Sequence, residues 1–178
     1  MILGKLEEKM ASFEEMRKGL LDELSSLPDE VLKTRPLEDK WSILEIVEHM
    51  AVAEREVLLG LPEYSEIRGF RRTFKNKLML KVVMFVLGNR IRVKVPSKTM
   101  NPKGELSLAD VRAAWDESQE WFRNYVAACD EEALRKAVFK HPVSGPIEPL
   151  QAVDMSIAHF KSHKAQIDRL LELSQAKQ

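Results

Sequence analysis

The sequence predicts an all-α fold, a four-helix bundle with an inserted basic segment between the second and third bundle helices. Apolar residues recur at three-to-four-residue spacing in four long stretches, which is typical of amphipathic helices. Alternating apolar and polar residues, the pattern of a half-buried strand, are confined to residues 90–95. A chain of 178 residues suits one domain, so we expect residues 1–178 to form a single bundle.

The first helix is predicted from an apolar stripe that consists of Leu6, Met10, Phe13, Leu20 and Leu24. Charged residues occupy most of its other face, as expected for a helix that covers a core. The helix should end between Ser25 and Pro28. The next residues, 27–40, contain two prolines and are predicted to form a connecting segment.

The second helix opens with a capping box, in which the Ser42 hydroxyl and the Glu45 carboxylate satisfy free amides of the first turn. It should run to about Leu59, because Gly60 and Pro62 then stop it. Its apolar stripe contains Ile46, His49, Ala53 and Val57. His49 is therefore predicted in the middle of a helix and on its apolar face, where a polar ring needs a partner.

The third helix is predicted from Ser107 to about Cys129, and the fourth from Pro149 to about Ser174. Cys129 continues the apolar stripe of the third helix, which favours a buried structural cysteine. The turn-rich sequence HPVSGPIEP precedes the fourth helix. The inward stripe of that helix consists of Ala152, Met155, His159, His163, Ile167 and Leu170.

Residues 64–105 lie outside the plan of the bundle. Leu78 to Leu87 is apolar and is predicted as a short extra helix, followed by an extended segment, although a hairpin turn at Gly88-Asn89 fits the same residues. Residues 67–104 carry 11 basic and no acidic side chains, whereas residues 1–66 carry 8 basic and 16 acidic ones. Docking on the acidic bundle, an anionic substrate and a membrane surface are open interpretations of this segment. The absence of a recognised motif and the net charge of zero disfavour nucleic acid.

His159 and His163 are four residues apart, so both rings project from one face of the fourth helix. If the second helix is its neighbour, His49 can meet them in the bundle core, where such proteins commonly hold metals. Three imidazoles would bind one ion and leave a coordination position open. The alternative hypothesis is a set of buried histidines that are satisfied by ordinary hydrogen bonds.

Two stretches of the chain, WSILEIVEHMAVAE and HPVSGPIEPLQAVDMSIAHFKSHKAQI, resemble the DinB-like, YfiT-related four-helix-bundle superfamily. The resemblance implies a divalent ion, nickel or zinc, held by His49, His159 and His163. It also implies activities found among such proteins, which include transfer of low-molecular-weight thiols to electrophiles, thiol-dependent isomerisation and metal-dependent hydrolysis. Family members often form homodimers, so a homodimer is expected.

Three further residues are candidates for supporting roles at this site. Glu45 lies one turn before His49 and could orient it or bind a metal-bound water, although its capping box explains it equally well. Gln166 corresponds to a glutamine of the family motif and could orient a ligand or pack at the helix surface. His141 precedes Pro142 and is interpreted as a turn residue near the mouth of a cavity rather than as a fourth ligand.

We therefore expect a metal-dependent enzyme of the thiol S-transferase or hydrolase type that acts on a small electrophilic molecule. A non-catalytic bundle that binds a small molecule or a protein, with the metal structural or absent, is the alternative. The N-terminus lacks the apolar run of a secretory signal, and the apolar run of residues 78–87 is too short to span a bilayer. These observations predict a cytoplasmic protein without a transmembrane segment.

Overall fold

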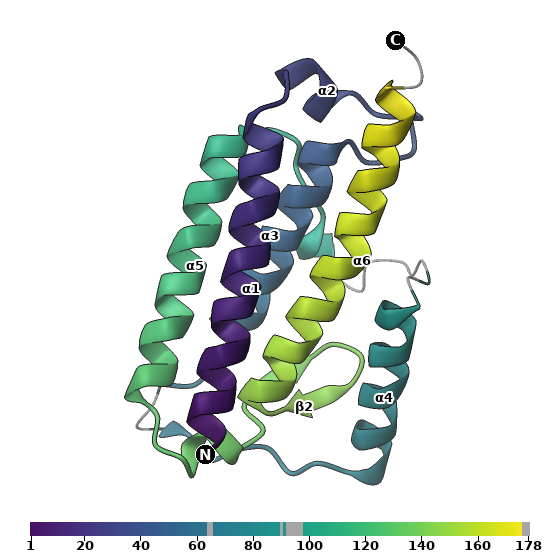
Figure 1. Cartoon of the computed structure of the whole chain (residues 1–178). Coiled ribbons are helices and arrows are strands. Elements are labelled where there is room, and N and C mark those ends of the chain that lie inside the picture. The colour runs from purple at the N-terminus through teal and green to yellow at the C-terminus, as the bar shows by residue number, and fades with distance from the viewer. Residues whose placement is uncertain (64–65, 90, 92–97, 176–178) are drawn as a thin grey trace.

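The structure, a computed structural model, describes residues 1–63, 66–89, 91 and 98–175. Four long helices run side by side, and they are α1 (Ile2–Ser25), α3 (Ile43–Leu59), α5 (Leu108–Ala128) and α6 (Pro149–Gln175) (Figure 1). Helix α1 packs against α6, and α3 packs against both α5 and α6. The predicted all-α bundle is confirmed, and the neighbouring positions of α3 and α6 meet the condition for a shared histidine site.

Three of the helices begin where the sequence supplies a capping box. The pairs are Ser42 with Glu45 at α3, Thr73 with Asn76 at α4 (Phe74–Gly88), and Ser107 with Asp110 at α5. In each pair, the first side chain accepts a hydrogen bond from the backbone amide of the second residue, and the second side chain accepts one from the backbone amide of the first. The boundaries predicted for the second, third and fourth bundle helices are accordingly within one residue of those observed.

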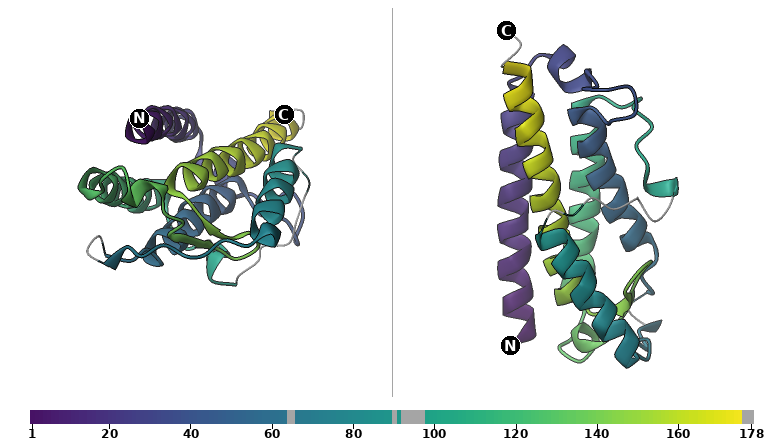
Figure 2. Two further views of the ribbon diagram at one scale, coloured as in Figure 1. Left: turned by 90° about the horizontal axis from the view of Figure 1, so that it is seen from below. Right: turned by 90° about the vertical axis from the view of Figure 1, so that its right-hand side faces the viewer.

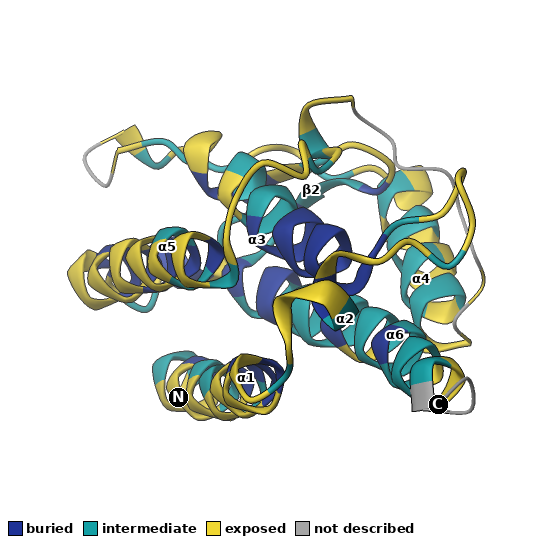
Figure 3. Ribbon diagram, turned by 90° about the horizontal axis from the view of Figure 1, so that it is seen from above, coloured by how far each residue is buried: buried dark blue, intermediate teal, exposed yellow. Residues whose placement is uncertain are grey.

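The first half of α3 is buried on all sides. Residues Ser42–Ala51 are all buried, and Figure 3 shows these turns at the centre of the bundle. Around them lies one apolar cluster with members such as Leu24, Trp115, Phe160 and Ile167. A second cluster fills the other end of the bundle and includes Leu6, Phe122, Leu134 and Phe139. The buried cysteine predicted at Cys129 belongs to this second cluster.

Three short elements occur where the sequence predicts only connections. Helix α2 (Asp29–Lys33) lies in the predicted connecting segment and buries Leu32. Strands β1 (Phe139–His141) and β2 (Gly145–Ile147) pair as an antiparallel hairpin in the segment before α6. Gly145 has a φ of 72°, and a Cβ there would lie 2.4 Å from Nδ2 of Asn76, so only glycine fits.

Helix α4 confirms the short extra helix predicted in the inserted segment. It contacts α6 and β2 and lies on the outside of α6 (Figure 2). It ends at Gly88, so Asn89 caps a helix rather than forming a hairpin turn. Apart from residue 91, the extended segment predicted at residues 90–95 lies outside the described residues. No helix among the described residues is long and apolar enough to cross a bilayer.

A short 3-10 helix, η2 (Lys98–Met100), follows the inserted segment, and a second, η3 (Ala133–Arg135), follows α5. Helix η2 contacts α3 directly. The segment from Lys98 to Gly104 therefore brings the end of the insert against the buried half of α3.

Candidate metal centre

The three histidines predicted as ligands converge between α3 and α6. His49 is 4% exposed, and one ring nitrogen from each histidine lies within 4.8 Å of the other two. The ring centroids of His159 and His163 are 4.5 Å apart, and those of His49 and each of the pair are 5.2 Å and 5.0 Å apart. All three pairs of rings meet edge to face, so the nitrogens surround one point instead of stacking.

Hydrogen bonds set the tautomers of two of these rings. Nδ1 of His49 lies 2.7 Å from the carbonyl oxygen of Met100, which can only accept, so Nδ1 donates. Nδ1 of His163 lies 3.2 Å from Oε1 of Gln166 and donates in the same way. In the neutral rings, both Nε2 atoms therefore carry a lone pair, which is the form that binds a metal.

Nε2 of His163 and Nε2 of His159 are 3.0 Å apart. Because His163 already has its proton on Nδ1, its Nε2 is an acceptor. The contact then requires either a proton on Nε2 of His159 or a cation that both nitrogens share. The geometry is thus suited to a proton or a metal ion but not to two bare lone pairs.

Burial keeps the histidine rings neutral. It lowers the pKa of His49, against a smaller opposite effect of the Met100 carbonyl. It lowers the pKa of His163 to about 4, with an added contribution from the charge of His49. The pKa of His159 is lowered well below its usual value by burial and by the charges of the other three histidines. Neutral imidazoles at physiological pH are ready to act as ligands.

Glu48 fixes the segment that orients His49. Its carboxylate is buried and accepts hydrogen bonds from the backbone amides of Lys103 and Gly104, at 2.8 Å and 2.9 Å. Gly104 has a φ of 73°, and a Cβ there would lie 3.3 Å from Oε1 of Glu45. This anchor holds η2 on α3, and η2 supplies the Met100 carbonyl to His49. Glu48 and Met100 were not predicted from the sequence, because their contacts join positions far apart in the chain.

Glu45 is occupied by structural contacts. One carboxylate oxygen accepts a hydrogen bond of 2.8 Å from the Ser42 amide, and the carboxylate also forms an ion pair with Arg35. Burial raises the pKa of Glu45, but the hydrogen bonds from Arg35 and Ser42 outweigh it and leave that pKa lowered. The capping-box role is therefore present, and the carboxylate of Glu45 is bound to Ser42 and Arg35 rather than to a histidine.

His141 and Gln166 take different positions relative to the three histidines. His141 lies in β1, and its Nδ1 accepts hydrogen bonds from the amides of Val143 and Ser144, at 3.2 Å and 3.1 Å. This is the turn role predicted for it, and burial lowers its pKa to about 4. Gln166 contacts His163 directly, as described above. Trp41, which was also not predicted from the sequence, packs against His49 with ring centroids 4.9 Å apart.

A further carboxylate, Glu54, faces α5 rather than the histidines. It accepts hydrogen bonds from the Trp115 indole, at 2.7 Å, and from the Gln119 amide. Burial raises its pKa to about 7, although the Trp115 bond acts in the opposite direction. Glu54 therefore titrates near neutrality at a place separate from the histidine cluster.

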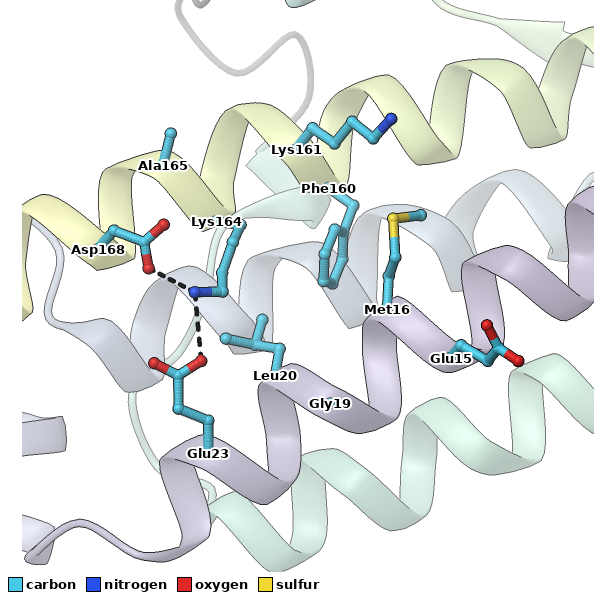
Figure 4. A pocket seen from close by; sticks show the side chains of 10 residues that line it. All are labelled: Glu15, Met16, Gly19, Leu20, Glu23, Phe160, Lys161, Lys164, Ala165 and Asp168. Atoms are coloured by element: carbon cyan, nitrogen blue, oxygen red, sulfur yellow. Dashed lines mark hydrogen bonds and ion pairs between the residues drawn. The ribbon is translucent and has the colours of Figure 1, made fainter.

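Two surface hollows lie away from the histidines. One, of about 440 Å³, lies between α1 and α6, where Lys164 forms ion pairs with Glu23 and Asp168 (Figure 4). Its α6 residues project roughly opposite to His159 and His163, because successive residues of a helix are about 100° apart. The other, of about 480 Å³, lies near the first turn of α4. Neither hollow is lined by any of the three ligand candidates.

Comparison with known proteins identifies the family of this chain. Residues 12–167 match the DinB superfamily, and the chain belongs to that family. It is similar to the uncharacterized protein YuaE of Bacillus subtilis (strain 168), with 24% identity over 163 residues, which cover 92% of this chain and 97% of YuaE. No solved structure matches the chain.

The low pKa of His141 predicts a pH effect on stability. Between pH 7 and pH 5 the unfolded chain gains a proton at this ring, whose unfolded pKa is about 6.5, whereas the folded ring with a pKa of about 4 stays neutral. The folded state therefore loses stability as the pH falls. His141→Asn retains an acceptor oxygen in the turn, and we expect it to reduce this loss by about 2 kcal/mol in urea unfolding.

The matched control is Lys140→Asn in the same strand, which should keep the pH dependence of the wild type. If the free energy of unfolding changes between pH 7 and pH 5 as much in His141→Asn as in the wild type, the fold does not hold this ring neutral.

Proposed function

We propose that His49, His159 and His163 bind a divalent metal ion, nickel or zinc, and that the protein is a metal-dependent enzyme. The type we favour is a thiol S-transferase or hydrolase that acts on a small electrophilic molecule. The observation that supports it most is the pair of Nε2 atoms 3.0 Å apart, with a third imidazole within 4.8 Å. Membership of the DinB superfamily supports the same proposal.

The donor set suits the proposed ion. Three neutral imidazoles are good ligands for zinc and for nickel, and three protein ligands leave one position for water or substrate. Two of the rings already donate Nδ1–H to an oxygen, which is the arrangement that directs Nε2 of metal-binding histidines toward the ion. The contact between His159 and His163 also leaves a place for a cation, as argued above.

The bound ion would supply one property, a lowered pKa of a coordinated water or thiol, so that hydroxide or thiolate is available near neutral pH. The protein's own residues do the rest. Met100 and Gln166 fix the orientation of two imidazoles, Glu48 holds Met100 in place, and burial keeps the rings unprotonated. The Trp41 ring covers His49 on one side and limits the access of water.

One observation favours the alternative, a non-catalytic bundle that binds a small molecule or a protein. The carboxylates near His49 on α3, Glu45 and Glu48, are both engaged in structural hydrogen bonds, so neither is free to act as a general base. Both surface hollows also lie away from the histidines. In this alternative, an ion at the site would stabilise the contact between α3 and α6 without performing chemistry.

The metal content of the purified protein tests the proposal. Protein prepared without chelators should contain nickel or zinc at a ratio near one ion per chain, measured by elemental analysis. His159→Ala should lose the ion because two imidazoles remain and one of them loses its 3.0 Å neighbour. His141→Asn, which alters the one histidine outside the cluster, should retain it. A metal-free wild type, or equal metal in His159→Ala, would contradict the proposal.

Catalysis is tested separately by conjugation of an electrophile with several cellular thiols and by hydrolysis of ester and amide substrates. Turnover by the wild type supports the enzyme if it is lost in His49→Ala and if added metal does not restore it. A metal-loaded protein without turnover in either assay supports the non-catalytic bundle.

Glu48→Gln should weaken metal binding by about tenfold or more, the usual effect of losing an outer partner of a ligand. The amide can accept only one of the two backbone hydrogen bonds, so the Met100 carbonyl is held less firmly against His49. Competition with a chromogenic chelator measures the affinity. Glu56→Gln on the same helix is the control, and equal affinities in the two variants would show that the anchor has no influence on the site.

A further inference from the structure

Helix α4 exposes large apolar side chains along its outer face. Four of them are spaced by three or four residues and share that face, with exposed fractions of 82% for Phe74, 51% for Leu78, 43% for Val82 and 63% for Phe85. The opposite face packs on the second apolar cluster through Leu80, Val83, Met84 and Leu87. The helix is therefore apolar on both sides, and only one side has a partner within the described residues.

Lysines border the exposed stripe on both sides. Lys75 lies along one edge and Lys77 and Lys81 lie along the other, given about 100° between successive residues. All three are exposed. The surrounding residues 67–104 contain no acidic side chain, in contrast to the acidic segments before and after them. The apolar stripe thus lies within a cationic surface.

A basic hollow adjoins the first turn of α4. It has a volume of about 480 Å³, and its lining includes Arg68, Arg71, Arg72, Lys77, Arg135 and Lys136. Arg72 pairs with Glu148, and Arg135 and Lys136 pair with Glu131 and Glu132. Arg68, Arg71 and Lys77 have no acidic partner among the residues that the structure describes. This hollow therefore retains uncompensated positive charge.

The hollow is built by a close contact between two chain segments. Gly69 has a φ of 69°, and a Cβ at this position would lie 3.0 Å from Cβ of Lys136. The Phe70 amide donates a hydrogen bond of 2.8 Å to the Ala137 carbonyl. The Nε atom of Arg72 is buried and has no hydrogen-bond partner in the described structure. The backbone contact thus brings the basic side chains of the hollow together, and the Nε–H group of Arg72 has no acceptor in the described structure.

The charge of this surface selects among possible occupants. A symmetric contact with a second copy would bring two equally basic faces together, which costs free energy. A nucleic acid would match the cations but not the phenylalanines. A membrane that contains anionic lipid matches both, because its headgroups attract lysine and arginine and its acyl boundary accepts apolar side chains.

We propose that α4 and the adjoining basic hollow bind the surface of a membrane rich in anionic lipids. The helix lies in the plane of the interface, and the stripe from Phe74 to Phe85 enters the acyl boundary. The flanking lysines reach the headgroups with their long side chains, and the hollow receives a lipid phosphate. This proposal is independent of metal binding by the histidines.

Co-sedimentation with vesicles tests the proposal. The full chain should bind vesicles of phosphatidylcholine and phosphatidylglycerol but not vesicles of phosphatidylcholine alone, and added salt should weaken binding. Lys75→Gln with Lys81→Gln should lower the affinity about thirtyfold, because each basic residue near an anionic surface contributes about 1 kcal/mol. Leu78→Gln with Phe85→Gln should lower it about a hundredfold through lost apolar burial. These side chains are exposed, so the variants should fold.

The matched control is Arg169→Gln with Leu173→Gln, which removes an exposed cation and an exposed apolar side chain from α6. It should bind vesicles as the wild type does. Equal binding to both kinds of vesicle, or variants of α4 that bind like the wild type, would overturn the proposal. Binding of soluble pyrophosphate without binding to vesicles would also overturn the proposal. Sedimentation that shows self-association, abolished by Leu78→Gln with Phe85→Gln and without vesicle binding, would assign the face to a second copy.

Discussion

The burial of three polar side chains in the first half of α3 is the constraint on which the rest of the structure depends. Glu45, Glu48 and His49 lie in consecutive turns that are covered on all sides. Burying a carboxylate or imidazole without any partner destabilises the fold by several kcal/mol. Losing a single hydrogen-bond partner of a buried group costs about 1 to 3 kcal/mol. Each of the three must therefore receive a partner from another part of the chain.

These partners organise the segments around α3. Arg35 comes from the connection after α1, and the amides of Lys103 and Gly104 come from the segment that returns to α5. Met100 supplies its carbonyl to His49. Two connections that contain little regular structure are thus fixed on the core by polar contacts. The orientation of His49 toward His159 and His163 follows from the same contacts.

The sequence predicted the features that depend on local pattern. Capping boxes and helical spacing gave α3, α5 and α6 within a residue, and the apolar stripes brought His49, His159 and His163 to one place. Glu48 was not predicted, because it looks like an ordinary charged helix residue and its partners are backbone amides more than fifty positions away. Helix α2 is too short for a periodic pattern to show. The exposed stripe of α4 was also not predicted, because a helix that is apolar on two faces has no clear amphipathic period.

The packing of α3 against α6 brings the three histidines together. His49 and His159 are roughly 110 residues apart in the chain, and closing a loop of that length is an entropic cost that grows slowly with its size. Apolar contacts such as Ile46 and Ile167, both fully buried in one cluster, already bring α3 and α6 together. The three ring nitrogens are therefore brought close together by the fold itself. In contrast to a zinc finger, which folds only when its metal binds, the fold of this bundle rests on apolar packing, so these histidines could be lost or changed in evolution without loss of the fold.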